Sequence, residues 1–91
     1  MPLLDDGEIQ KKASQVPQWS VKDRSLVRTF VFENFIGSID FVNRLVEPAE
    51  AAGHHPDLTI SYNKVTVSLT SHDAGGLTEQ DFQLAQVISG L

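Results

Sequence analysis

Two segments near the middle of the chain alternate between apolar and polar residues, and this pattern constrains the fold more than any other. The alternating apolar residues are Leu58, Ile60 and Tyr62 in the first segment and Val65, Val67 and Leu69 in the second. A period of two is typical of strands that bury one face and expose the other. Since the Asn63-Lys64 step joins the segments and Asn tolerates turn backbones, residues 57–62 and 64–70 predict a β-hairpin. On this pattern Tyr62 is expected to pack with its strand.

The remaining chain predicts a second hairpin and three helices. Residues 19–22 and 25–32, on either side of Asp23-Arg24, are rich in β-branched and aromatic residues, which favours two strands. Apolar residues recur at helical spacing in three other segments, residues 5–15, 35–52 and 78–91. The residues expected to cap these helices at their starts are Asp5, Asn34 and Thr78. Asp5 with Glu8, and Thr78 with Asp81, have the spacing of a capping box.

Pro48 lies inside the longest expected helix. A proline there removes one backbone hydrogen bond and costs about 3 kcal/mol, unless the helix kinks or ends at that point. We therefore expect a local kink at Pro48, and a helix end at Gly53.

The expected order of elements is α-β-β-α-β-β-α. Short antiparallel strands with one polar face, together with amphipathic helices, favour an α+β fold in which a four-stranded antiparallel sheet carries three helices on one face. With 91 residues, the chain 1–91 is expected to form a single domain. The exposed face and edges of so small a sheet favour oligomerisation.

Composition excludes several classes of function. The chain has no cysteine, which excludes disulfides, thiolate catalysis and cysteine-bound zinc. Its net charge of -5 disfavours direct contact with nucleic acid, which requires a basic surface. No apolar run approaches the roughly 20 residues that span a bilayer. We therefore expect a cytoplasmic protein that contacts neither membrane nor nucleic acid directly.

The chain has three histidines, and the hairpin brings them together. His54 and His55 precede its first strand, and His72 follows its second. In an antiparallel pair, the start of one strand and the end of the next lie at the same end. Glu50, one helical turn before His54, and Asp81, in the first turn of the last helix, are expected near the same place.

A histidine cluster flanked by carboxylates has two chemical interpretations. Imidazoles bind zinc, and they also give and take protons near neutral pH. Adjacent histidines such as His54 and His55 rarely both bind one ion, and no helix carries two histidines four residues apart. We therefore expect no metal and favour acid–base chemistry.

Ordinary structural roles are the alternatives for each residue. A single loop histidine usually lies on the surface, and Glu50 on a solvated helix face. For Asp81, a structural role in its capping box and a functional role are weighted about equally. Trp19 is most often a core or edge anchor.

An ordered set of residues resembles a known family. The set comprises Glu50-Ala-Ala-Gly-His54-His55-Pro56, Tyr62-Asn-Lys-Val65, Thr70-Ser-His72 and Gly76-Leu-Thr-Glu-Gln-Asp81. Its order and spacing are similar to those of the pterin-4a-carbinolamine dehydratases. Residues on the N-terminal side of this set agree as well, namely Glu8-Ile9, Trp19 and Phe30-Val-Phe32. The resemblance therefore covers nearly the whole chain.

The resemblance implies a dehydratase of 4a-hydroxytetrahydropterin, the carbinolamine left by aromatic amino acid hydroxylases. The products would be quinonoid dihydropterin and water, in tetrahydropterin recycling. The pterin is the substrate, and the resemblance implies no cofactor. A functional link to an aromatic amino acid hydroxylase is implied as well.

The resemblance also implies roles for individual residues. His54 and His72 match the acid–base histidines, and His55 matches a histidine that helps to bind and orient the pterin. Glu50 and Asp81 match acidic positions that fix a histidine tautomer or accept hydrogen bonds from the pterin.

Two further positions bear on this comparison. Trp19 is expected near the pterin ring. Gly53 stands where relatives often carry an acidic residue, so that position can make no catalytic contribution here.

Members of this family assemble as homodimers or homotetramers, with the sheet extending across the subunit boundary. Some also serve as dimerisation cofactors of a homeodomain transcription factor. A non-catalytic interaction protein on the same scaffold, such as a transcriptional coactivator or an assembly factor, is therefore the alternative to an enzyme.

Overall fold

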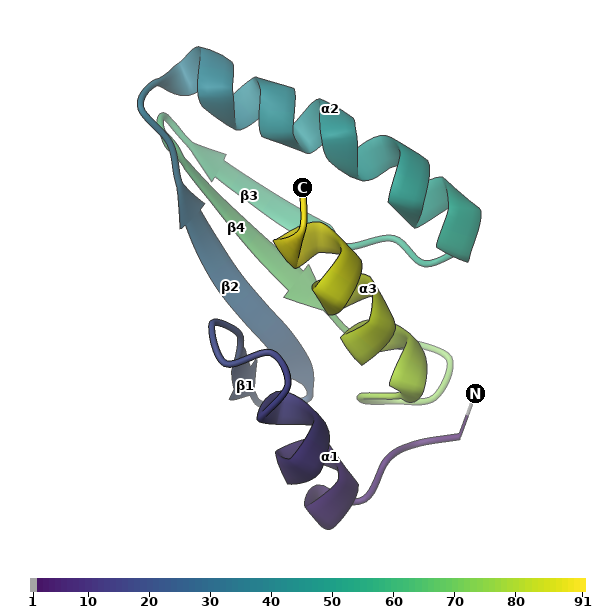
Figure 1. Cartoon of the computed structure of the whole chain (residues 1–91). Helices are drawn as coiled ribbons and strands as arrows, with labels where there is room; N and C mark the ends of the chain where they lie inside the picture. The colour runs from purple at the N-terminus through teal and green to yellow at the C-terminus, as the bar shows by residue number, and fades with distance from the viewer. Residues whose placement is uncertain (1) are drawn as a thin grey trace.

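Within residues 2–91, which the computed structural model describes, the chain forms three helices and four strands in the expected α-β-β-α-β-β-α order (Figure 1). The elements are α1 (Asp6–Ala13), β1 (Ser20–Lys22), β2 (Ser25–Val31), α2 (Phe35–Ala52), β3 (Asp57–Ser61), β4 (Lys64–Leu69) and α3 (Glu79–Ser89). Every end lies within two residues of its predicted position. The α+β fold class is confirmed.

The strands form one antiparallel sheet in the order β1-β2-β4-β3. β4 is central: its Val67 lies between Arg28 of β2 and Leu58 of β3. β1 and β3 are therefore the edges of the sheet. No helix in the described part of the chain is both long and apolar enough to cross a membrane.

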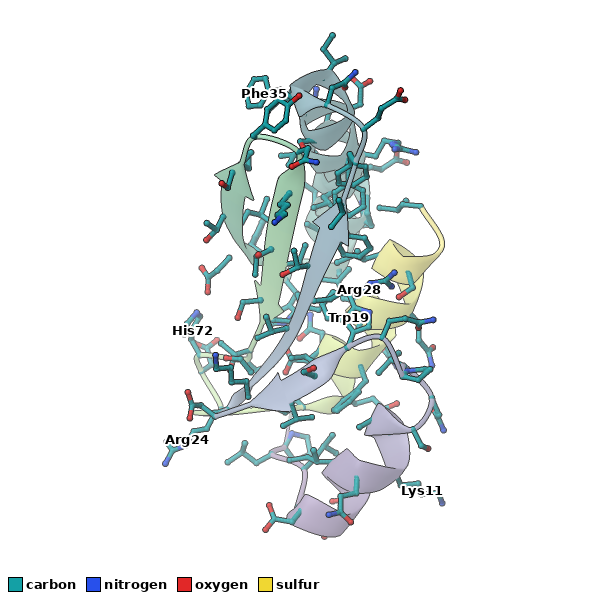
Figure 2. All side chains as sticks on the ribbon, turned by 90° about the vertical axis from the view of Figure 1, so that its left-hand side faces the viewer. Lys11, Trp19, Arg24, Arg28, Phe35 and His72 are labelled. Carbon is teal, nitrogen blue, oxygen red and sulfur yellow. The ribbon has the colours of Figure 1, made fainter. Side chains whose placement is uncertain are left out.

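The helices cover one face of the sheet, as the side view in Figure 2 shows. Alternate residues of the central strand point into this layer, so that Val65, Val67 and Leu69 are fully buried. The buried residues that cover them include Phe41 and Leu45 of α2 and Phe82, Ala85 and Ile88 of α3. The apolar residues of the alternating pattern in β4 are therefore the ones that face the core.

Trp19 anchors the first hairpin to the last helix. Its side chain is buried, and its indole N–H donates to Oγ of Ser89 at 2.9 Å. The Arg28 guanidinium donates to the same oxygen at 3.2 Å and lies 4.1 Å from the centre of the Phe30 ring. The C-terminal end of α3 is thus tied to β1 and β2.

The predicted turn of the central hairpin is wrong by one residue. The turn consists of Tyr62 and Asn63, and Lys64 already belongs to β4. Tyr62 has a φ of 50°, and its side chain is 64% exposed rather than packed. Side-chain donors to backbone carbonyls explain this, because the carbonyl of Tyr62 accepts from Ser38 Oγ at 2.8 Å and the side-chain amide of Asn63 donates to the Phe32 carbonyl at 3.1 Å.

Helix α2 continues through Pro48 and ends at Gly53, as expected for its C-terminus. Figure 1 shows it as one uninterrupted helix. Pro48 therefore does not end the helix, and the kink stays a prediction. In regular helical geometry, the carbonyl of Arg44 would receive the N–H that proline lacks.

Replacing Pro48 measures how much it destabilises the folded protein. Pro48→Ala is expected to raise the free energy of unfolding by about 1–3 kcal/mol, because a helical hydrogen bond is gained, less the smaller loss of chain stiffness in the unfolded state. Urea denaturation measures the change, with Glu47→Ala on the same helix as a control that stays within about 0.5 kcal/mol. An unchanged stability would mean that a bend in α2 already relieves the proline.

Candidate active site

The three histidines line one pocket at the end of the sheet where β3 begins and β4 ends. The pocket has a volume of about 380 Å³ and is lined by His54, His55 and His72 together with the loop that precedes α3. Volumes of this order are typical of small-molecule sites. Figure 2 shows His72 pointing outward beyond the strands, in line with its exposed side chain.

The end of α2 explains how two of these histidines reach the pocket. Gly53 adopts a left-handed conformation with a φ of 61° and reverses the chain after the helix. The N–H of His54 then donates back to the carbonyl of Ala49 at 3.1 Å. A side chain at position 53 would strain this backbone, which is a physical reason for glycine there.

One histidine is held by a buried carboxylate. His54 Nε2 lies 2.5 Å from Oδ1 of Asp81, and Asp81 is fully buried. The second carboxylate oxygen accepts from the backbone N–H of Thr78 and from the hydroxyl of Ser71, each at 2.9 Å. Asp81 therefore caps α3 and also contacts His54.

The other two histidines face carboxylates at the surface. His55 Nε2 contacts Oε2 of Glu50, with both side chains about two-thirds exposed. His72 Nε2 lies 3.9 Å from Oδ2 of Asp57, and these side chains are more exposed still. Each imidazole thus has a carboxylate neighbour, although pairs this exposed contribute only about 0–1 kcal/mol to stability.

Three residues of this site were not identified from the sequence. Asp57 faces His72, Ser71 donates to Asp81, and Gln80 lines the pocket while its amide donates to the Ala52 carbonyl at 2.8 Å. Of the three, Asp57 could have been identified from the sequence, because the first residue of β3 lies beside the end of β4 in an antiparallel hairpin.

The structure does not bring Trp19 to the pocket. Trp19 lies against Ser89 at the C-terminal end of α3, whereas the pocket adjoins the N-terminal end. Glu50 is placed at the margin, where it lines an adjoining apolar groove with His55. Between residues 2 and 91, no three histidine or acidic side chains are arranged to hold a metal ion.

A small α+β domain with a three-histidine pocket matches one known family. Residues 2–91 match the family model described as pterin 4 alpha carbinolamine dehydratase. A Cyanothece sp. protein provisionally named a pterin-4-alpha-carbinolamine dehydratase is 63% identical over 98% of this chain and 92% of its own length. A protein with the same provisional name from Picosynechococcus sp. is 67% identical over 90% of this chain and 89% of its own length. The chain belongs to the pterin-4a-carbinolamine dehydratase family.

Two solved structures are similar to this chain. The crystal structure of a transcriptional coactivator/pterin dehydratase from Brucella melitensis has a TM-score of 0.90 and 28% identity, covering 96% of this chain and 95% of that one. A pterin dehydratase-like RuBisCO assembly factor of the alpha-carboxysome has a TM-score of 0.64 and 20% identity, covering 79% and 83%. The second similarity shows the fold alone.

Because Asp81 is buried and Glu50 is exposed, we expect the two carboxylates to contribute differently to the free energy of unfolding. Asp81→Ala is expected to lower the free energy of unfolding by about 2–4 kcal/mol, because the Thr78 N–H and the Ser71 hydroxyl lose their acceptor inside the protein. Glu50→Ala, the exposed counterpart, is expected to change it by less than about 1 kcal/mol. Chemical denaturation of both variants measures this, and equal losses would contradict the buried network.

Proposed function

We propose that this protein dehydrates 4a-hydroxytetrahydropterin to quinonoid dihydropterin and water, as a step of tetrahydropterin recycling. The observation that carries this proposal is the gathering of three imidazoles, each beside a carboxylate, around one pocket in a member of this family. The substrate is the product of aromatic amino acid hydroxylases, so the proposal implies such an enzyme in the same cell.

The reaction requires two proton transfers. Hydroxide is a poor leaving group, so the 4a-hydroxyl must gain a proton as its bond to carbon breaks. The neighbouring ring nitrogen must lose a proton as the C=N bond forms, and water leaves. Imidazoles suit both transfers because they exchange protons near neutral pH. The proposed mechanism uses neither a metal nor a cofactor.

We assign these transfers to His54 and His72. His54 is largely buried, and Asp81 both orients its ring and favours one tautomer. His72 stands at the exposed side of the pocket, where it meets solvent as well as substrate. His55, beside Glu50, then binds and orients the pterin. Trp19 has no part in this assignment, because it does not line the pocket.

The activity has a direct test. Enzymatically generated 4a-hydroxytetrahydropterin is mixed with the protein, and its dehydration is followed by ultraviolet absorbance against the uncatalysed rate. His54→Ala and His72→Ala are each expected to lower kcat by about 100-fold or more, since each removes a proton-transfer group. The double variant is expected to approach the uncatalysed rate.

Controls separate a lost site from a lost fold. Gln18→Ala, in an exposed loop outside the pocket, is expected to keep full activity. Circular dichroism and urea denaturation check that the histidine variants are folded. No acceleration by the folded wild-type protein would overturn the enzyme proposal.

The second candidate function is protein binding. The similar protein from Brucella melitensis is described as a transcriptional coactivator as well as a pterin dehydratase. The described part of the chain also has an apolar groove of about 280 Å³ between α2 and β3, lined by Val42, Val46 and Leu58 among others. The groove adjoins the pocket at His55, so binding and catalysis are compatible on one chain. An inactive but folded protein would favour this alternative.

We further propose that the protein is a homodimer or homotetramer joined through the β3 edge. β3 leaves the hydrogen-bonding groups of its outer edge unpaired, and every residue in it is exposed. Its inward-facing Leu58 and Ile60 are 37% and 40% exposed, and Val46 of α2 nearby is 57% exposed. Pairing with a second β3 would cover these groups and extend the sheet.

Sedimentation velocity tests the assembly. The wild-type chain is expected to sediment as a dimer or tetramer, and Ile60→Lys to shift it toward monomer because a charge enters the covered face. Val21→Lys is the matched control, since Val21 is similarly exposed on β1 at the opposite edge of the sheet. A monomeric wild type, or equal effects of the two variants, would contradict the β3 interface.

A further inference from the structure

We propose that Ser71 is a positioning residue of the active site. Its hydroxyl holds the Asp81 carboxylate so that Oδ1 accepts a hydrogen bond from the Nε2–H of His54, which leaves Nδ1 as the nitrogen that meets the substrate. The catalytic consequence rests on the proposed function. The tautomer of His54 is a property of the protein alone, and it can be measured without any substrate.

The hydrogen bonds at Oδ2 of Asp81 determine which atoms donate. The backbone N–H of Thr78 can only donate, and it does so to Oδ2 at 2.9 Å. Ser71 Oγ lies 2.9 Å from Oδ2 and 2.9 Å from Thr78 Oγ1. A serine hydroxyl has one proton, so if Ser71 donates to the carboxylate it must accept from Thr78. The hydroxyls thus form a chain that runs from Thr78 through Ser71 to Asp81.

This arrangement leaves Oδ1 for His54. With both donors on Oδ2, the free lone pairs of Oδ1 face His54 Nε2 at 2.5 Å, and Nε2 carries the proton. In the part of the chain described, no polar side-chain atom is both fully buried and without a hydrogen-bond partner. Nδ1 of His54 has no partner there, so it reaches the surface, and His54 lines the pocket. Nδ1 is therefore the nitrogen available for proton transfer.

The hydroxyl of Ser71 can be removed without dismantling its loop. The backbone N–H of Ser71 donates to the Gly76 carbonyl at 3.0 Å, and its carbonyl accepts from Ala74 and Gly75 at 3.1 and 3.0 Å. These contacts involve no side-chain atom of Ser71. Ser71→Ala would keep them, and the Asp81 carboxylate would retain the Thr78 N–H alone on Oδ2. The carboxylate could then turn away from Nε2, and the preference of His54 for the Nε2–H tautomer would weaken.

Nuclear magnetic resonance of the free protein tests this inference. Ring ¹⁵N shifts of His54, recorded where its imidazole is neutral, distinguish a proton on Nε2 from a proton on Nδ1. The wild type is expected to show the Nε2–H form and Ser71→Ala a mixture of both. Ser71→Thr keeps a hydroxyl and is expected to restore the Nε2–H form. Ser61→Ala, the same change at the far end of β3, is the matched control without effect.

The kinetic readout follows the same variants. Ser71→Ala is expected to lower kcat about tenfold while KM changes less than about twofold, because the proton-transfer group is misoriented but the pterin contacts remain. Ser71→Thr is expected to recover most of kcat. A purely structural role would instead lower stability without a change of tautomer.

Each outcome decides the inference. A wild-type His54 protonated on Nδ1, or a Ser71→Ala variant with an unchanged tautomer, would overturn it. If Ser71→Ala does not fold, Ser71→Cys replaces it: the thiol has a similar size and is a weaker donor, so a partial shift of tautomer is expected, and no shift would overturn the inference. A wild type that lacks dehydratase activity yet shows the expected tautomers would refute the proposed function and leave the role of Ser71 intact.

Discussion

The buried carboxylate of Asp81 is the interaction on which the rest of the site depends. A charge removed from water must be compensated by hydrogen bonds, and Asp81 has three polar partners, from Thr78, Ser71 and His54. These partners belong to the start of α3, the loop after β4 and the loop after α2. One side chain therefore joins the segments that form the pocket, and its loss would affect the fold and the shape of the pocket together.

The three histidine–carboxylate pairs differ mainly in burial. The ring of His54 is largely buried and contacts the buried Asp81, whereas His55 and His72 meet carboxylates that are themselves exposed. A fixed ring suits a proton transfer that depends on geometry, because little reorganisation is needed during the reaction. Exposed rings such as those of His55 and His72 can adjust their positions when a ligand enters. The pocket thus combines one preorganised group with two adaptable ones.

The order of the strands explains both the pocket and the open edge. Because β4 lies between β2 and β3, the chain leaving β4 emerges next to the chain entering β3, and all three histidines fall there. The same order places β3 at the edge, where the layer formed by α2 and α3 leaves Leu58 and Ile60 partly uncovered. A single topological choice therefore creates a site at one end of the sheet and an unpaired edge along its side.

The sequence by itself determined the elements, the fold class and the meeting of the histidines with Glu50 and Asp81 at one end of the hairpin. These follow from local signals: the alternation around Val65 and Val67, the caps of the helices, and the antiparallel geometry of a short hairpin. Only the tertiary structure decided that Asp81 is buried and reaches His54, that Asp57 and Ser71 join the site, and that Trp19 lies at the far end of α3. The turn of the central hairpin also begins at Tyr62, one residue earlier than predicted, where the Tyr62 carbonyl accepts a hydrogen bond from Ser38 of α2. Each of these depends on how segments distant in the chain pack against one another, and periodicity along a sequence carries no information about that packing.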